Sequence, residues 1–176
     1  QDLLGDSYGG MQLSYSQELS PLGTAGALRK ATPLLKSNLV LVMNGDSYCD
    51  VDLQAFFDWH QSRTSNATLL LTYLNDARRY GLVEVGEDGA ILSFIEKNNK
   101  DGPGWINAGI YLLKRDMIFD IPDTMDAVSL EQDVFPNWIG RGLRGYKAQC
   151  RFLDIGVPAA YAAAEDFFSE KGDLRL

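Results

Sequence analysis

Three stretches dominated by apolar residues set the pattern of this chain: residues 39–43 (LVLVM), 67–73 (ATLLLTY) and 106–113 (INAGIYLL). Short apolar runs between turn-forming residues are typical of strands. The first run has no polar position and contains two β-branched valines, which predicts a strand buried on both faces. The other two runs predict further strands, the last with a glycine, Gly109, at its centre.

Two segments with apolar residues at helical spacing lie on either side of the first strand. Residues 24–35 predict one helix, and Asp52 is a favourable N-cap for a second helix from Leu53 to about Arg63. The apolar positions are Ala27, Leu28, Ala31, Leu34 and Leu35 in the first helix and Leu53, Phe56, Phe57 and His60 in the second.

The second half of the chain adds a hairpin and shorter elements. Residues 82–85 and 91–96 flank Glu87-Asp88-Gly89, which favours a β-hairpin turn. Ser129 predicts a helix N-cap with Gln132 completing a capping box, residues 151–155 predict a short strand, and Pro158 opens a helix of residues 159 to about 170. This alternation of strands and helices, with one inserted hairpin, indicates an α/β fold: a mixed sheet flanked by helices, in a single domain of residues 1–176.

Length and charge narrow the class of protein. A chain of 176 residues is long enough for one domain with its own core. The formal net charge of -8 argues against nucleic acid or an anionic membrane surface as a partner. The negative net charge is compatible with small phosphorylated ligands, because Mg²⁺ held by carboxylates can supply the positive charge that they need. No apolar stretch approaches the roughly 20 residues needed to span a bilayer.

The two cysteines and the only histidine receive structural interpretations. Cys49 and Cys150 form no closely spaced pair, which predicts reduced, buried thiols in a cytoplasmic protein rather than a disulfide or a zinc site. His60 lies in the middle of a predicted helix and is expected to be structural rather than catalytic. The aromatic residues expected in the core are Phe56, Phe57, Phe167 and Phe168.

Two carboxylates follow predicted strands, and each has a glycine close by. Asp46 follows Gly45 after the first strand, and Asp154 precedes Gly156 in FLDIG (152–156). Ligands of open α/β sheets bind beyond the carboxyl ends of strands, so two converging carboxylates there would form an oxygen-rich Mg²⁺ site. Asn-Gly-Asp is also favourable turn chemistry, so a simple turn at residues 44–46 remains an alternative.

The triplet Asp50-Val51-Asp52 offers a different metal site. Its Asp-x-Asp spacing is the usual metal site of many glycosyltransferases. Because Asp52 is also the predicted helix cap, we favour Asp46 as the metal ligand.

Three further motifs carry candidate chemistry. Residues 21–28 (PLGTAGAL) place two glycines and Thr24 where a helix opens, which would let a ligand approach the backbone, although a turn with Thr24 as N-cap explains them too. Lys97, after Glu96 at a strand end, can reach a phosphate as a compact charge. Asn107 could offer its amide to a sugar hydroxyl. For these last two sites the alternative is an ordinary polar strand end.

The order of these motifs resembles that of the sugar-1-phosphate nucleotidyltransferases, which join a nucleoside triphosphate and a sugar 1-phosphate into a nucleotide sugar and release pyrophosphate. The motifs, in order, are PLGTAGAL (21–28), NGD (44–46), YGLV (80–83), FIEK (94–97), INAGIYLL (106–113) and FLDIG (152–156). NGDSYCDVDL, GPGWINAGIYLL and SLEQDVFP are most similar to the D-glycero-α-D-manno-heptose 1-phosphate guanylyltransferases, with mannose-1-phosphate guanylyltransferases as near neighbours.

The resemblance implies a Rossmann-like nucleotide-diphospho-sugar transferase fold and the substrates GTP and a sugar 1-phosphate. It also implies Mg²⁺ bound by Asp46 and Asp154. A homo-oligomer is among the assemblies left open. The implied nucleotide-binding residues are Leu22, Gly23, Thr24 and Gly26, the sugar-binding residues are Gly81, Glu96 and Asn107, and the catalytic residues are Asp46, Lys97 and Asp154.

The sequence departs from the family at three places. Asn98 follows the Glu-Lys pair where proline is common, and Val157 follows FLDIG where threonine is usual. The family's opening loop, Gly-Gly-x-Gly-Thr-Arg-Leu with a downstream Lys-Pro, does not occur in these 176 residues. We therefore expect a domain without its first strand and triphosphate loop, and a catalytically incomplete chain. A non-catalytic regulatory or binding homologue, and a metal-dependent glycosyltransferase using Asp50 and Asp52, are the alternatives.

Overall fold

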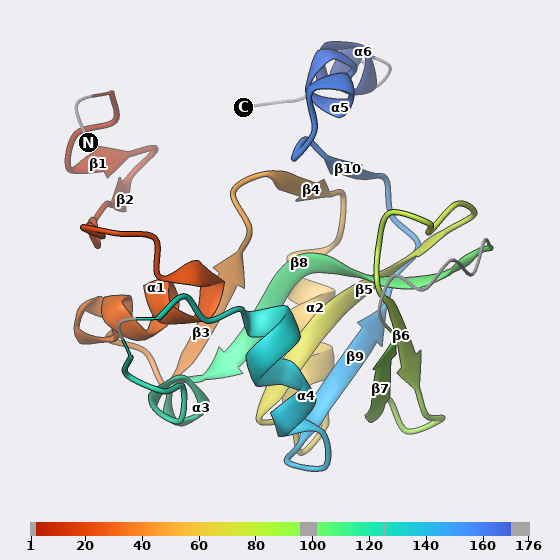
Figure 1. Ribbon diagram of the computed structural model, residues 1–176, viewed down its shortest axis with the longest axis horizontal. Coiled ribbons are helices and arrows are strands. Elements are labelled where there is room, and N and C mark those ends of the chain that lie inside the picture. The colour runs from red at the N-terminus through yellow and green to blue at the C-terminus, as the bar shows by residue number, and fades with distance from the viewer. Residues whose placement is uncertain (1–2, 96–101, 125, 170–176) are drawn as a thin grey trace. The chain divides into compact units, whose positions relative to one another are not determined.

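The computed structural model describes residues 3–95, 102–124 and 126–169. Its elements alternate between strands and helices (Figure 1). The chain forms two compact units: unit 1 comprises Gln1–Val40 with Lys114–Asn137, and unit 2 comprises Leu41–Leu113 with Trp138–Leu176. The predicted single domain is therefore described unit by unit.

The main sheet has six strands in the order β7-β6-β8-β5-β9, with β3 also paired to β8 (Figure 1). Strands β5 and β9 are parallel, whereas β5 with β8, β6 with β7 and β6 with β8 are antiparallel. The sheet is therefore mixed, as predicted. Its strands are β3 (Leu39–Met43), β5 (Ala67–Leu74), β6 (Leu82–Val85), β7 (Ile91–Ile95), β8 (Gly104–Lys114) and β9 (Leu143–Lys147).

Strand β8 contains a bulge at the point where it contacts Asn44, the residue that follows β3. The pairing with β5 passes from Leu69↔Tyr111 to Leu71↔Asn107, so β8 carries extra residues between these pairs. Gly109 lies in the bulge with φ 75°, and its carbonyl accepts from the Asn44 amide at 2.8 Å. A Cβ on Gly109 would lie about 3.0 Å from the Asn44 side chain, so glycine permits this close approach.

The two apolar strands β3 and β5 differ in burial. Residues 67–72 of β5 are all buried, and full burial of one leucine side chain contributes about 1.5–3 kcal/mol. In β3, Leu41 and Met43 are 43% and 52% exposed, so the prediction that this strand is buried on both faces is wrong. The pairing found for β3 within the described residues is with β8, which leaves its other edge without a described strand.

Helix α2 (Leu53–Ser62) begins where predicted. The Asp52 side chain accepts from the amides of Gln54 and Ala55, which confirms the N-cap. Phe56 is fully buried and its ring lies 5.4 Å from that of Tyr146 on β9, so α2 covers one face of the sheet. Two expected core positions, Leu53 and Phe57, are instead exposed.

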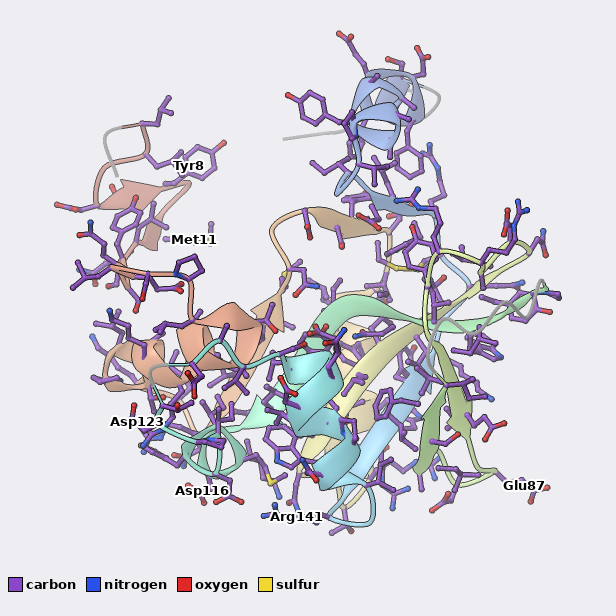
Figure 2. The ribbon with its side chains drawn as sticks, viewed as in Figure 1. Tyr8, Met11, Glu87, Asp116, Asp123 and Arg141 are labelled. Atoms are coloured by element: carbon purple, nitrogen blue, oxygen red, sulfur yellow. A yellow bond between two sulfur atoms is a disulfide. The ribbon has the colours of Figure 1, made fainter. Side chains whose placement is uncertain are left out.

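A separate two-stranded antiparallel sheet joins β4 (Ser47–Cys49) to β10 (Phe152–Asp154). A disulfide between Cys49 and Cys150 flanks it, and Figure 2 shows the bond in yellow. The prediction of two reduced thiols is wrong, because β4–β10 pairing brings together cysteines that lie 101 residues apart. The predicted last helix is divided into α5 (Pro158–Ala162) and α6 (Ala164–Ser169). Phe167 and Phe168 on α6 are half-buried rather than core residues.

Unit 1 is mainly helical, with a short hairpin near its start. Ser129 caps η2 by accepting from the amides of Glu131 and Gln132. The reciprocal acceptor for the Ser129 amide is Asp133 at 2.7 Å, rather than the expected Gln132. No helix among the described residues is long and apolar enough to cross a membrane. The elements are β1 (Ser7–Tyr8), β2 (Met11–Gln12), α1 (Gly23–Ala31), η1 (Thr32–Leu34), α3 (Arg115–Phe119) and η2 (Leu130–Val134), followed by α4 (Phe135–Trp138).

Candidate functional site

Strand pairing in unit 2 brings Asp46 and Asp154 to one place. Asp154 pairs with Ser47 in the β4–β10 ladder, and the Ile155 amide donates to the Asp46 carbonyl at 2.9 Å. Asp46 follows β3 through a glycine turn, whereas Asp154 ends β10 more than 100 residues later. The expected convergence of these two carboxylates is therefore found.

Gly156 leaves a space that both carboxylates face. The Gly156 amide donates to Asp154 Oδ1 at 2.8 Å. A Cβ built on Gly156 would lie 3.0 Å from Asp154 Oδ1 and 3.7 Å from Asp46 Oδ2. Because two anionic oxygens border a volume that glycine keeps open, the donor set fits a hard divalent cation. Among the described residues no group of three or more acidic, histidine or cysteine side chains is gathered for a metal, so water would complete the coordination.

Arg79 and Tyr80 also border Asp154, although neither was a predicted site residue. Arg79 Nη2 lies 3.8 Å from Asp154 Oδ2, and its guanidinium lies 5.8 Å from the centre of the Tyr80 ring. Burial raises the pKa of the Tyr80 hydroxyl, and the negative charge of Asp154 raises it further. The available sequence signal was the Tyr80-Gly81 motif, which Arg79 directly precedes.

Gly81 and Asn107 are brought close by neighbouring strands. Leu82, next to Gly81, pairs with Ile106, next to Asn107. The Asn107 amide donates to Tyr111 Oη at 2.9 Å, and Asn107 Oδ1 accepts from the Gly109 amide at 3.0 Å. The side chain is thus hydrogen-bonded within its own strand, as the structural alternative predicts, although Asn107 lies inside β8 rather than at its end. Glu96 and Lys97 lie outside the described residues.

The segment expected to bind nucleotide lies in unit 1, and Thr24 has a different role from the cap considered above. Helix α1 begins at Gly23, and the N-cap position is Leu22, without a side-chain cap bond. Thr24 Oγ1 donates to Glu131 Oε2 at 3.1 Å and accepts from the Leu130 amide at 2.8 Å. Its hydroxyl therefore links α1 to the start of η2.

The glycines of this segment are closely packed. Gly23 has φ 72°, and a Cβ there would lie 2.8 Å from the backbone C and N of Val128. The Ala25 amide donates to the Val128 carbonyl, and a Cβ on Gly26 would lie 2.9 Å from Leu22 Cβ. These glycines do allow another group to approach the backbone closely, as predicted, but that group is the Val128 backbone rather than a ligand.

Two other candidates have structural partners in unit 2. His60 is buried, and its Nδ1 lies 2.7 Å from Thr68 Oγ1, consistent with the structural interpretation. The Asp52 carboxylate is occupied as the cap of α2. If both carboxylates of the Asp50-x-Asp52 triplet bound a metal, Asp52 would have to give up its hydrogen bonds as the helix cap.

A pocket of about 360 Å³ lies elsewhere in unit 2, at the turn of the β6–β7 hairpin. Glu87 marks the tip of this turn in Figure 2. Its lining includes Trp59, Arg63, Glu87, Asp88, Tyr146 and Lys147, and it contains none of the predicted site residues.

The comparisons with known proteins agree with the resemblance drawn from the motifs. The family described as nucleotidyl transferase matches residues 1–171. Mannose-1-phosphate guanylyltransferase of Mycobacterium tuberculosis is 33% identical over 168 residues, which are 94% of this chain and 45% of that protein. D-glycero-alpha-D-manno-heptose 1-phosphate guanylyltransferase of Aneurinibacillus thermoaerophilus is 33% identical over 162 residues, which are 92% of this chain and 69% of that protein.

A solved structure shows the same fold. HddC from Yersinia pseudotuberculosis has a TM-score of 0.74 and 33% sequence identity, covering 86% of this chain and 64% of that chain. HddC has also been solved in complex with GMP-PN. The chain thus spans between about half and two thirds of the length of these relatives. The predicted fold class is confirmed, and the chain belongs to the nucleotidyl transferase family.

Proposed function

We propose that this protein is a sugar-1-phosphate guanylyltransferase that joins GTP and a heptose or mannose 1-phosphate into a GDP-sugar and pyrophosphate. The observation that carries the proposal is the pairing of β4 with β10, which places Asp46 and Asp154 around the space at Gly156. Residues 1–176 would form part of one nucleotidyltransferase domain. The names of the relatives support guanine and these two sugars.

Asp46 and Asp154 would hold Mg²⁺. Their oxygens match the ligands that Mg²⁺ prefers, and two carboxylates with water are a usual set for this ion. When bound, the ion supplies positive charge to the reacting phosphates. Arg79, 3.8 Å from Asp154, orients that carboxylate from its other side.

The remaining residues would bind and orient the two substrates. Lys97 would neutralise the phosphate of the sugar, whose oxygen attacks the α-phosphorus of GTP in line. Holding both substrates in this arrangement supplies much of the rate enhancement, so catalysis needs little covalent chemistry from the protein. Nucleotide contacts are assigned to Leu22, Gly23, Thr24 and Gly26, and sugar contacts to Gly81, Glu96 and Asn107.

Asn107 is the sugar-binding candidate for which the structure gives the most detail. One amide hydrogen and the carbonyl oxygen are engaged by Tyr111 and Gly109, which fixes the orientation of the side chain. An asparagine has a second amide hydrogen, which is sufficient to donate to one sugar hydroxyl. Preorganisation of this kind lowers the entropy cost of binding.

The test measures pyrophosphate release by the full-length protein, including any residues encoded before Gln1. Asp46→Asn and Asp154→Asn should each lower turnover at least 100-fold with GTP, Mg²⁺ and the matching sugar 1-phosphate. Asp50→Asn is the matched control, because it removes a nearby carboxylate that the proposal does not use, and it should keep near-wild-type turnover. Near-wild-type turnover of Asp46→Asn would exclude the proposed metal site.

The same assay separates the alternatives. A panel of nucleoside triphosphates and sugar 1-phosphates identifies the base and the sugar, and no release with any pair favours a non-catalytic homologue. A glycosyltransferase would instead consume a nucleotide sugar and lose activity with Asp50→Asn. The 176 residues alone should release no pyrophosphate, because they contain no glycine-rich triphosphate loop.

A further inference from the structure

The disulfide and the two carboxylates lie at opposite ends of the same short ladder. Cys49 pairs with Phe152 at one end, next to the Cys49–Cys150 bond, and Ser47 pairs with Asp154 at the other. The ladder has three residue pairs, and only the middle one, Leu153 with Tyr48, lies between the pair of Cys49 and the pair of Asp154. The geometry of the carboxylate pair therefore depends on whether this ladder keeps its register.

The other supports of the ladder among the described residues are non-covalent, and they include a backbone hydrogen bond beyond each end, from Ile155 to Asp46 and from Asp50 to Arg151. A two-stranded ribbon is marginally stable on its own in water, and this one forms a sheet apart from the six-stranded one. The Tyr48 ring contacts Phe167 and Phe168 with centres 6.0 and 5.0 Å apart, and Arg151 donates to the Phe167 carbonyl. These contacts come from α6, a helix of six residues, whereas the disulfide joins the two sides covalently.

The disulfide also connects the ladder to the most buried strand of the sheet. Thr72 Oγ1, fully buried on β5, lies 3.4 Å from Cys150 Sγ. Two residues before Cys150, the Ala148 amide donates to the Leu71 carbonyl at 2.9 Å. Strand β4, which follows Asp46 directly, is thus bonded to a segment whose position is fixed by β5.

We propose that Cys49 and Cys150 are positioning residues for the metal site: their disulfide keeps Asp46 and Asp154 in register, and its reduction weakens divalent-cation binding. The inference rests on the proposed metal role of the two carboxylates. Reduction by a dithiol breaks the S–S bond, gives two thiols on the protein and leaves the dithiol oxidised to a disulfide. The carboxylates remain present, but the distance between them then depends on non-covalent contacts alone. These include the three residue pairs, the backbone hydrogen bonds Ile155 to Asp46 and Asp50 to Arg151, the Arg79–Asp154 ion pair, and the contacts of Tyr48, Arg151 and Phe152.

The experiment titrates the full-length protein with Mn²⁺ and measures free Mn²⁺ by electron paramagnetic resonance. Oxidised protein is compared with protein that has been reduced with a dithiol and desalted without oxygen. Alkylation and peptide mass spectrometry follow Cys49 and Cys150 in each sample, and neither should be alkylated in the oxidised form. The dissociation constant for Mn²⁺ should rise about tenfold on reduction, as it does when groups that orient metal ligands are removed.

The variant C49S/C150S provides the matched control. It should bind Mn²⁺ as weakly as the reduced wild type, and the dithiol should leave its affinity unchanged. A thermal melt in parallel separates loss of register from unfolding, because both samples should remain folded at the titration temperature. Unchanged Mn²⁺ affinity on reduction, or two free thiols in protein exposed to oxidant, overturns the inference.

Two carboxylate variants distinguish failure of this inference from failure of the proposed function. If Asp46→Asn and Asp154→Asn abolish Mn²⁺ binding while reduction has no effect, the metal site stands and the role of the disulfide is wrong. If neither variant changes Mn²⁺ binding, the metal site is wrong, and the positioning role falls with it.

Discussion

Gly23 in unit 1 and Gly156 in unit 2 both stand in motifs that predict ligand binding, and the structure uses their missing side chains in opposite ways. At Gly23 the space is filled by the chain itself, because a Cβ there would overlap the Val128 carbonyl oxygen and lie 2.8 Å from the Val128 backbone C and N. At Gly156 the nearest atoms are carboxylate oxygens of Asp154 and Asp46. The first glycine serves packing, whereas the second leaves charged oxygens facing an open space.

The difference shows how to separate a structural glycine from one that serves a site. A glycine whose neighbours are backbone atoms closes a contact within the fold, so its replacement costs stability. A glycine whose neighbours are like-charged oxygens leaves an unfavourable arrangement that a cation would relieve, so its replacement costs binding. Two predictions test this distinction for glycines, and a third tests the corresponding distinction for carboxylates.

Gly23→Ala should have the largest effect, on folding. The new Cβ would meet the Val128 backbone, and a non-glycine residue at φ 72° adds conformational strain. The free energy of unfolding should fall by about 3 kcal/mol, the combined scale of such strain and of overpacking. Urea titrations followed by circular dichroism measure this loss.

Gly45→Ala is the control for that substitution. Gly45 has open space around its Cβ position and is not among the glycines with positive φ, so its stability should change by no more than about 0.5 kcal/mol. Equal losses for the two variants would remove the distinction between filled and open glycine positions.

Gly156→Ala should have a smaller effect, on binding rather than on folding. Its methyl group would lie 3.0 Å from Asp154 Oδ1 and 3.7 Å from Asp46 Oδ2, in the space assigned to the cation. Affinity for Mn²⁺ should fall about tenfold, equivalent to about 1.4 kcal/mol, while the urea midpoint stays near that of the wild type. A large loss of stability with unchanged Mn²⁺ affinity would place Gly156 in the same class as Gly23.

The third prediction concerns Asp76, a carboxylate whose charge is met within the chain. Hydrogen bonds from the Arg78 guanidinium and amide lower its pKa from 3.8 to about 2. Because the folded pKa is the lower one, the stabilisation is present above pH 4 and is lost as the pH falls toward 2. The effect on stability should be small, because both side chains are exposed.

Carboxyl-carbon NMR provides the measurement. Asp76 should titrate near pH 2 in the wild type, and Arg78→Gln should return its pKa toward 3.8. Addition of Mg²⁺ should shift the Asp154 signal and leave that of Asp76 unchanged. Arg78 hydrogen-bonds both oxygens of Asp76, at 2.8 and 2.5 Å, whereas Arg79 lies 3.8 Å from Asp154. A shift of both signals would show that a close, two-oxygen arginine pair does not separate structural from binding carboxylates here.

The fold was predictable where local patterns determine it. The Asp52 cap, the 82–95 hairpin and strand β3 follow from cap, turn and apolar signals over a few residues. The burial of β3 did not follow, because Leu41 and Leu71 occupy similar apolar runs and only their neighbours in space differ. Strand β9 was missed because Leu143–Lys147 alternates apolar, charged and glycine residues and gains its stability from parallel pairing with β5.

The sequence indicated which residues to consider for the candidate site, but it indicated few of the contacts that these residues make. The motifs singled out Asp46 and Asp154 as candidates. They meet because Asp46 directly precedes β4, a strand that was not predicted, and β4 pairs antiparallel with β10, which ends at Asp154. The disulfide could not be predicted from spacing, since it depends on a pairing across about a hundred residues. Thr24 was considered as a cap on local grounds, but its partners, Leu130 and Glu131, are equally distant in sequence.

The hydrogen bond from the Ala25 amide to the Val128 carbonyl determines when unit 1 can finish packing during synthesis. Helix α1 leaves the ribosome about a hundred residues before the segment that it packs against, a delay of about 5 to 20 s at ordinary rates of synthesis. During that interval Ala25 and Gly26, buried in the finished protein, have no Val128 to contact. Unit 1 therefore completes its packing only after most of unit 2 has been synthesised.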